Sequence, residues 1–171
     1  MDLTRYIRDV PDFPTPGIQF KDLGPLLAEA DAFDDAIDRL VEPFRGVALD
    51  AVGAIEARGF LYGAAVARAL GAGLVPIRKP GKLPGACLGI DYALEYGSDR
   101  LEIQADALAP GARVLLVDDV LATGGTLAAA AALCETAGAT LIGAAVVLEI
   151  AALGGRRHLR GDMPLHALLT C

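Results

Sequence analysis

Apolar and polar positions follow two different patterns along this chain. Short apolar runs predict buried strands, and longer alanine-rich runs with apolar residues three or four positions apart predict helices. The predicted strands are 51–55, 73–77, 114–117 and 140–148, and the predicted helices are 31–45, 60–70 and 126–137. Strands that alternate with helices indicate an α/β fold, in which a mostly parallel, twisted sheet is flanked by helices.

Two segments depart from this alternation. Residues 1–27 contain DFPTPG and GP, so their proline and glycine predict a small N-terminal cap, or hood. Residues 78–90 are typical of a long loop, and 91–96 and 101–104 flank a Gly-Ser-Asp turn like the arms of a hairpin. Long loops in compact domains tend to be functional, so we expect a flexible lid loop over 78–97.

Length and composition narrow the class of protein. The chain has 171 residues, which is the length of a single domain. Its net charge of −7, without a visible basic stripe, argues against nucleic acid as a partner. The longest apolar stretches have eight residues, too few to cross a membrane, and the N-terminus lacks the apolar region of a secretion signal. We therefore expect small-molecule substrates.

Cysteine and histidine usage points to no metal site or disulfide framework. Cys87, Cys134 and Cys171 are odd in number and form no C-x-x-C pair, which fits a reducing, cytoplasmic location. His158 and His166 have no partner at metal-ligand spacing, so we expect a surface residue and a strand residue.

The stretch VLLVDDVLATGGT, residues 114–126, holds the densest candidate chemistry. Asp118 and Asp119 follow a buried strand, at the edge where open α/β sheets bind ligands. The TGGT that follows leads into a helix, so unobstructed backbone N–H groups can surround a phosphate at the positive end of the helix dipole. Two carboxylates beside a phosphate cradle suit a phosphorylated sugar, because each can accept hydrogen bonds from ribose hydroxyls. The plainer alternative is that one Asp caps the helix and the glycines only turn the chain.

This stretch resembles the phosphoribosyl diphosphate (PRPP) binding motif of the type I phosphoribosyltransferases. Four further segments, DFPTPGIQFKD, EARGFLYG, IRKPGKLPG and LEYGSDRLEIQ, resemble those of the adenine phosphoribosyltransferases in order and spacing, over most of residues 6–155. The resemblance implies a Rossmann-like fold, transfer of the phosphoribosyl group of PRPP to adenine to give AMP and diphosphate, Mg²⁺ as cofactor, and a homodimer.

Charge and resemblance together assign the PRPP site. The departing diphosphate must be neutralised locally, and two of the chain's three lysines lie beside Arg78 in the expected lid. Arg58 lies in a tight turn, where its guanidinium can donate two hydrogen bonds to a diphosphate. Because the diphosphate is the leaving group, we also assign Arg58 a catalytic role. No residue is expected to bind metal directly; Mg²⁺ would arrive with PRPP, with Asp118 the candidate contact. The predicted PRPP-binding residues are Arg58, Arg78, Lys79, Lys82, Tyr96, Asp118, Asp119, Ala122, Thr123, Gly124, Gly125 and Thr126.

The resemblance also assigns proton transfer and the base. The pattern LEYG places the proton exchange with the purine on Glu95. In the hood, Phe20 would lie against the base and the backbone near Gln19 and Lys21 would read its edge, with Ile150 on the other face. Lys21 stands where many members carry arginine, and Gln19 where an apolar residue is common. Transfer to another base, such as xanthine, therefore stays open.

Two alternatives come from other classes. A non-catalytic PRPP-sensing regulator would need a DNA-binding domain or a basic face, and the chain has neither the length nor the charge for one. A receiver domain also ends a strand with paired acids, but only about 50 residues follow Asp119, too few for the βα units that such a fold would still need.

Overall fold

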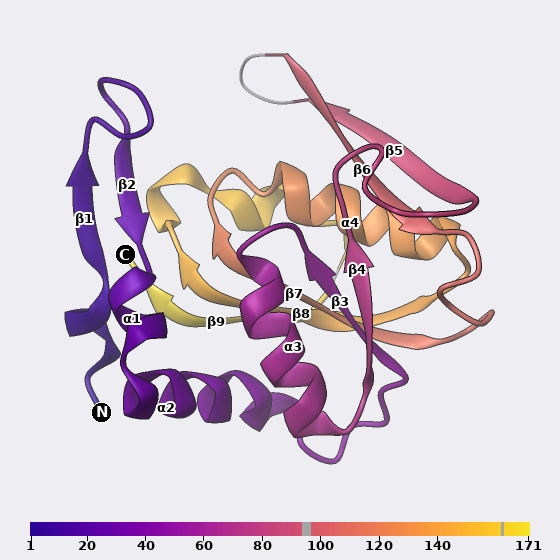
Figure 1. The fold of residues 1–171 in the computed structure, drawn as a ribbon, viewed down its shortest axis with the longest axis horizontal. Helices are drawn as coiled ribbons and strands as arrows, with labels where there is room; N and C mark the ends of the chain where they lie inside the picture. The colour runs from indigo at the N-terminus through magenta and orange to yellow at the C-terminus, as the bar shows by residue number, and fades with distance from the viewer. Residues whose placement is uncertain (94–96, 162) are drawn as a thin grey trace.

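The computed structural model describes residues 1–93, 97–161 and 163–171. Its centre is a five-stranded sheet in the order β4-β3-β7-β8-β9, in which every neighbouring pair is parallel (Figure 1). The strands are β3 (Ala51–Ile55), β4 (Gly73–Ile77), β7 (Arg113–Leu121), β8 (Thr140–Glu149) and β9 (Leu165–Thr170). The α/β prediction is confirmed.

Helices cover both faces of the sheet. On one face lie α1 (Gly24–Ala28), α2 (Ala30–Val41) and α3 (Gly59–Leu70), whose apolar sides share a buried cluster with the sheet. On the other face lies α4 (Gly125–Thr136). Short 3-10 turns span Leu3–Tyr6, Glu42–Phe44, Ala151–Leu153 and Gly155–His158. None of the helices in the described part of the chain is long and apolar enough to cross a membrane.

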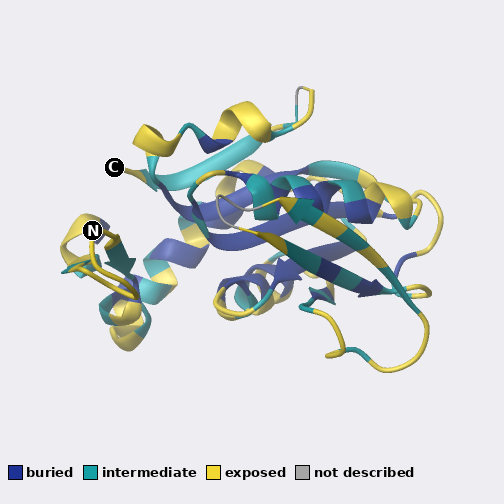
Figure 2. Ribbon diagram, turned by 90° about the horizontal axis from the view of Figure 1, so that it is seen from above, coloured by how far each residue is buried: buried dark blue, intermediate teal, exposed yellow. Residues whose placement is uncertain are grey.

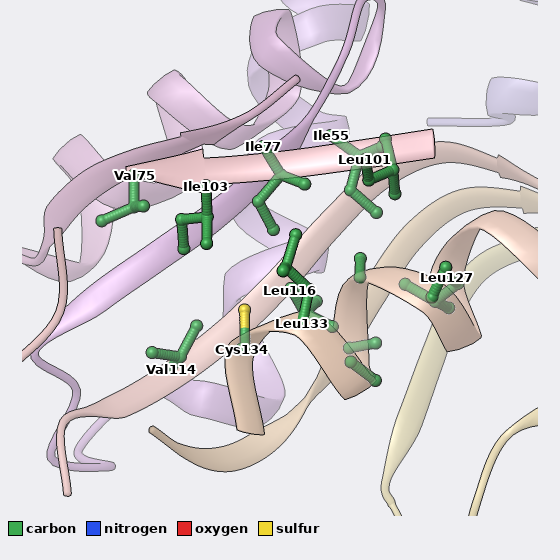
Figure 3. Close-up of a cluster of buried hydrophobic side chains, with 14 of the residues drawn as sticks. Ile55, Val75, Ile77, Leu101, Ile103, Val114, Leu116, Leu127, Leu133 and Cys134 are labelled. Carbon is green, nitrogen blue, oxygen red and sulfur yellow. The ribbon is translucent and has the colours of Figure 1, made fainter. Parts of the chain in front are cut away.

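The hairpin of β5 (Cys87–Ala93) and β6 (Ser98–Gln104) packs over α4. Figure 3 shows its buried side chains: Leu101 and Ile103 of β6 meet Ile77 of β4 and Leu133 and Cys134 of α4. Burial raises the pKa of the Cys134 thiol to about 12, as expected for a cysteine that serves as a small apolar residue. This hairpin therefore extends the core beyond the sheet.

A second hairpin stands apart from the sheet at the N-terminus. Strands β1 (Arg8–Pro11) and β2 (Gln19–Asp22) form a two-stranded antiparallel sheet of their own. Leu3, Leu23 and Leu26 anchor this region in the core beside α2. Figure 2 shows the rest of the hairpin largely exposed, in contrast to the buried central strands. The two hairpins lie on opposite sides of the molecule in Figure 1.

Several element boundaries differ from the sequence prediction: β6 begins at Ser98, inside the predicted Gly-Ser-Asp turn, and three other differences have a clear physical reason. Strand β7 continues to Leu121 instead of ending at Val117, because its pairing with β8 runs on through Leu121 and Glu149. The first of the predicted helices ends at Val41 and continues as a 3-10 turn, since Pro43 cannot donate a helical hydrogen bond. The loop that begins at residue 78 ends where β5 starts at Cys87, because alternate residues of β5 pack on the core.

The histidines lie as the sequence predicts. His158 is exposed in a 3-10 turn and His166 is a residue of β9. All three cysteines are free thiols.

Candidate active site

A cavity of about 480 Å³ opens at the carboxyl ends of the central strands. Five separate segments line it: residues 18–21 at the start of β2, the turn after β3, Lys79 after β4, the end of β7 with the residues that follow it, and the residues after β8. Ligands bind at this edge of open α/β sheets. The lining residues are Ile18, Gln19, Phe20, Lys21, Glu56, Ala57, Arg58, Lys79, Asp118, Asp119, Val120, Leu121, Ala122, Thr123, Gly124, Thr126, Leu127, Ile150 and Leu153.

Asp118 and Asp119 are two buried carboxylates on β7, exposed by only 8% and 6%. The Asp118 carboxylate accepts a hydrogen bond from the Asp119 N–H over 2.8 Å. A side chain at Gly59 would press on that carboxylate, so the glycine lets α3 begin directly beside it. Burial, and then the neighbouring charge of Asp119, raise the pKa of Asp118 well above its ordinary value. A ligand that donates hydrogen bonds here would relieve that cost.

Arg58 connects the carboxylates to the N-terminal hairpin. Its Nε lies 2.6 Å from Oδ2 of Asp119, and its guanidinium lies over the Phe20 ring, 4.9 Å from the centroid. The opposite charges and the cation–π contact hold the side chain at the centre of the cavity. A diphosphate entering the cavity would meet this guanidinium directly.

The loop 122–126 turns from β7 into α4. Gly124 adopts a left-handed conformation, with φ of +87°, and α4 begins at the next residue. The Ala128 N–H donates to the Gly124 carbonyl over 2.9 Å, so the earlier N–H groups of this turn stay available to a ligand. Because these N–H groups stand at the positive end of α4, the loop can hold an anion.

The basic residues expected in the lid separate into two groups. Lys79 lines the cavity, and its ammonium binds Asp99 and Tyr92, lowering the pKa of Asp99. Arg78 instead pairs with Glu56, Nε to Oε2 at 3.1 Å, and its Nη1 donates to the Lys82 carbonyl. Neither Arg78 nor Lys82 is among the lining residues.

Glu56 orders the start of the lid. It accepts the Lys79 backbone N–H over 2.8 Å as well as the Arg78 guanidinium. Burial alone would raise the pKa of Glu56, but these two hydrogen bonds outweigh it and the pKa is lowered. An ionised Glu56 therefore fixes the backbone that carries Lys79 into the cavity.

The predicted base-binding residues all line the cavity. Gln19, Phe20 and Lys21 enter from β2, and Ile150 from the segment after β8. The Phe20 ring packs edge-on against Phe13, with 5.0 Å between centroids. The Lys21 ammonium is drawn away to Asp9, 2.6 Å from it. An aromatic ring and an aliphatic side chain in the lining of one cavity suit a flat heterocycle.

The structure also adds residues that the sequence analysis missed. Ile18 and Leu153 line the cavity without any signal in the sequence beyond their apolar character. Tyr92 lies 3.3 Å from the Thr126 hydroxyl, oxygen to oxygen, and so ties the β5–β6 hairpin to α4. In the sequence, the only indication of this role for Tyr92 is its place in a strand in which apolar residues alternate. Glu95 and Tyr96, both predicted site residues, lie outside the described residues.

The residues present fit a magnesium ion that arrives with its substrate. Within 1–93, 97–161 and 163–171, no cluster of three or more His, Cys, Asp or Glu could hold a metal. Asp119 Oδ2 is buried and accepts no aligned hydrogen bond, although the Arg58 charge is near. Mg²⁺ is commonly bound by one or two carboxylates together with substrate phosphates. Asp118 and Asp119 are the residues that could contribute in that way.

Comparison with known proteins places this geometry in a family. Residues 27–162 match the phosphoribosyl transferase domain. An adenine phosphoribosyltransferase of Xanthomonas campestris pv. campestris (strain B100) is 57% identical over 164 residues, covering 96% of this chain and 88% of that protein. The crystal structure of adenine phosphoribosyltransferase from Rhodothermus marinus has a TM-score of 0.95 at 47% identity, covering 99% of this chain and 96% of that one.

A second similar structure was solved with ligands. The adenine phosphoribosyltransferase of Saccharomyces cerevisiae, complexed with a dideoxy-imino-altritol bisphosphate and adenine, has a TM-score of 0.92 at 42% identity and covers 98% of this chain and 97% of that one. The likeness extends over the hairpins and the cavity as well as the sheet. The chain belongs to the phosphoribosyltransferase family, among the adenine phosphoribosyltransferases.

Proposed function

We propose that this chain transfers the 5-phosphoribosyl group of PRPP to adenine, releasing AMP and diphosphate, as a step of purine salvage. The observation that carries the proposal is that the Asp118–Asp119 pair, the 122–126 loop and Phe20 line one cavity. The carboxylates, the anion-binding loop and the aromatic ring offer one binding group each for the ribose, the 5′-phosphate and the base of the product. The relatives named adenine phosphoribosyltransferase support the choice of base.

The PRPP site is proposed to hold the sugar at three points. Backbone N–H groups of the 122–126 loop bind the 5′-phosphate, and Asp118 and Asp119 accept hydrogen bonds from the ribose hydroxyls. Arg58 and Lys79 stabilise the departing diphosphate, which needs local cations in a chain of net charge −7. Asp118 and Asp119 would hold the Mg²⁺ that arrives with PRPP, and that ion would supply positive charge against the same leaving group.

Catalysis then depends on position and on one proton. Bond cleavage at C1′ passes through an oxocarbenium-like state, so holding the base in line and excluding water supply most of the acceleration. Phe20 and Ile150 hold the two faces of adenine, and Gln19 and Lys21 read its edge. Glu95 exchanges the proton at the imidazole nitrogens of the purine. Arg78 and Lys82 reach the diphosphate only when the lid, residues 78–97, closes.

We further propose a cytoplasmic homodimer. Leu61 on α3 and Leu74 on β4 are large apolar side chains exposed by 50% and 43%, which a partner subunit would cover. The three free cysteines fit a reducing compartment. Sedimentation equilibrium should give twice the chain mass, and a concentration-independent monomer would contradict the dimer.

The function is tested by offering the purified protein PRPP and Mg²⁺ with adenine, hypoxanthine, guanine or xanthine, one at a time. We expect a nucleotide and diphosphate with adenine far faster than with the other bases. Faster turnover of xanthine than of adenine would show that xanthine is the preferred substrate. Binding of PRPP without turnover of any base would favour a PRPP-sensing regulator.

A further inference from the structure

The segment that follows β8 packs with its backbone against the 122–126 loop. A Cβ atom added at Gly155 would clash with the Ala122 carbonyl oxygen, and one added at Gly124 would clash with the Gly155 carbonyl oxygen. Two backbones that approach this closely leave little freedom to either. The conformation of the loop therefore depends on where Gly155 lies.

The same segment carries apolar side chains into the cavity. Ile150 and Leu153 both line it. The Ile150 N–H donates to the Leu121 carbonyl over 2.9 Å, and the Leu153 N–H donates to the Ile150 carbonyl over 3.1 Å. Residues 150–155 thus contact both the expected base position and the expected phosphate position.

An ion pair between Glu149 and Arg156 joins the two ends of this segment. Glu149, the last residue of β8, is buried, and Arg156 places Nε at 2.8 and 2.9 Å from its two carboxylate oxygens and Nη2 at 2.7 Å from Oε2. The remaining arm, Nη1, donates to the Leu165 carbonyl of β9 over 3.2 Å. The fork of the guanidinium matches both the carboxylate and the neighbouring strand, which the single ammonium of lysine cannot do.

We propose that the Glu149–Arg156 ion pair is a positioning element that sets the affinity for both substrates at once. It fixes the ends of residues 150–155, and these present Ile150 to the base and hold Gly155 against the 122–126 loop. Neither charged side chain lines the cavity, so the pair acts through the segment between them. The inference rests on the proposed function and adds to it two residues outside the cavity.

The test compares Arg156→Lys with Arg157→Lys. Both keep a positive charge in the same 3-10 turn, but the Arg157 side chain is exposed and folds over Gly154. Arg156→Lys should raise the KM for PRPP and the KM for adenine together, each by about two- to thirtyfold, the range that supporting residues exert on a distant site. The kcat should change little, because uniform binding is lost. Arg157→Lys should leave all three constants unchanged.

A purely structural role gives a different pattern. A smaller folded fraction lowers kcat and leaves each KM unchanged, and that result, or an effect on only one KM, would overturn the proposal. Glu149→Gln, which keeps the size of the side chain, should repeat the joint rise in KM if Arg156→Lys does not fold; failure of both variants to fold would also overturn it. Calorimetric titration with PRPP should weaken in parallel, which separates this proposal from a failure of the transferase assay.

Discussion

At the scale of single residues, the two neighbouring carboxylates of β7 favour ligand binding but lower the stability of the fold. Asp118 is buried, and its pKa is raised well above the ordinary 3.8, by burial first and then by the charge of Asp119. The folded protein therefore binds a proton at the Asp118 carboxyl group more tightly than the unfolded chain does. The stability that this difference in the Asp118 pKa gives the folded state is fully present below pH 3.8. It is lost as the pH rises through the raised pKa.

Asp118→Asn should consequently stabilise the protein at neutral pH and weaken PRPP binding. The gain should be about 1.4 kcal/mol for each unit by which the pKa is raised, and should vanish near pH 3. The lost charge-assisted hydrogen bonds should cost roughly 1.5–3 kcal/mol of PRPP affinity. Urea unfolding at several pH values and calorimetric titration measure the two effects.

Asp91→Asn is the matched control for this variant. Asp91 is 72% exposed on β5 and should alter neither quantity by more than a small amount. A parent protein more stable than Asp118→Asn at pH 7, or unchanged PRPP affinity in the variant, would contradict the roles given to Asp118.

Glu95→Gln tests the expected proton transfer. The amide keeps the size of the carboxylate but removes its basic oxygen, so turnover should fall by about 10²- to 10⁴-fold. PRPP affinity, measured by titration, should stay close to the parent value because Asp118, Asp119 and the 122–126 loop are unchanged. An equal loss of turnover and PRPP affinity would make Glu95 a structural residue, and near-normal turnover would leave positioning as the whole of catalysis.

Some of these residues could be recognised in the sequence because they are contiguous. Asp118, Asp119 and the 122–126 loop form one motif, so a strand and a helix start bring them together without further information. Contacts between remote segments could not be predicted in this way. The pairing of Glu56 with Arg78 depends on how the residues after β3 and β4 meet, and that of Lys79 with Asp99 on how the residues after β4 meet β6.

At the scale of elements, glycine determines how closely α3 lies on β3. A Cβ atom at Gly63 would overlap with that of Ala54 in the strand below. Gly63→Ala should therefore destabilise the protein by about 1–3 kcal/mol through overpacking, although alanine favours helices. Urea unfolding measures the loss, and the double variant with Ala54→Gly should recover part of it. A single variant as stable as the parent would show that α3 and β3 can separate at no cost.

The segment 78–97 is the element expected to move. Gly81, Gly85 and most of the residues between them are exposed, whereas Lys79 is bound at both its backbone and its side chain. Amide hydrogen exchange in this segment should slow when PRPP and Mg²⁺ are added, because the diphosphate engages its basic residues. Exchange in α2 serves as the internal control. Equal exchange with and without ligand would contradict a lid.

The sequence predicted these elements well where periodicity was the signal. Strands β3 and β4 begin and end as expected, because both are short apolar runs bounded by polar residues or glycine. The errors lie where pairing decides the boundary. Asp118 and Asp119 end an apolar run, yet β8 continues to pair with β7 beyond them, so that two charged residues lie within a strand.

At the scale of the whole molecule, an acidic chain places basic side chains in the cavity where an anionic substrate would bind. The net charge is −7, yet Arg58 and Lys79 both face the cavity, each beside a carboxylate. Residues at the carboxyl ends of the parallel strands line this cavity together with residues 18–21 of the N-terminal hairpin, which lie far from them in sequence. Function therefore depends on long-range assembly that no single motif contains.

The most direct test of the account is a mass balance of the reaction, made on the parent protein and on Asp118→Asn combined with Asp119→Asn. With PRPP, Mg²⁺ and labelled adenine, the parent should form one AMP and one diphosphate for each PRPP consumed. The double variant should fold and lose most of that activity at the same PRPP concentration. Diphosphate released without AMP, or a double variant as active as the parent, would contradict the assignment of this cavity as the site of adenine phosphoribosyl transfer.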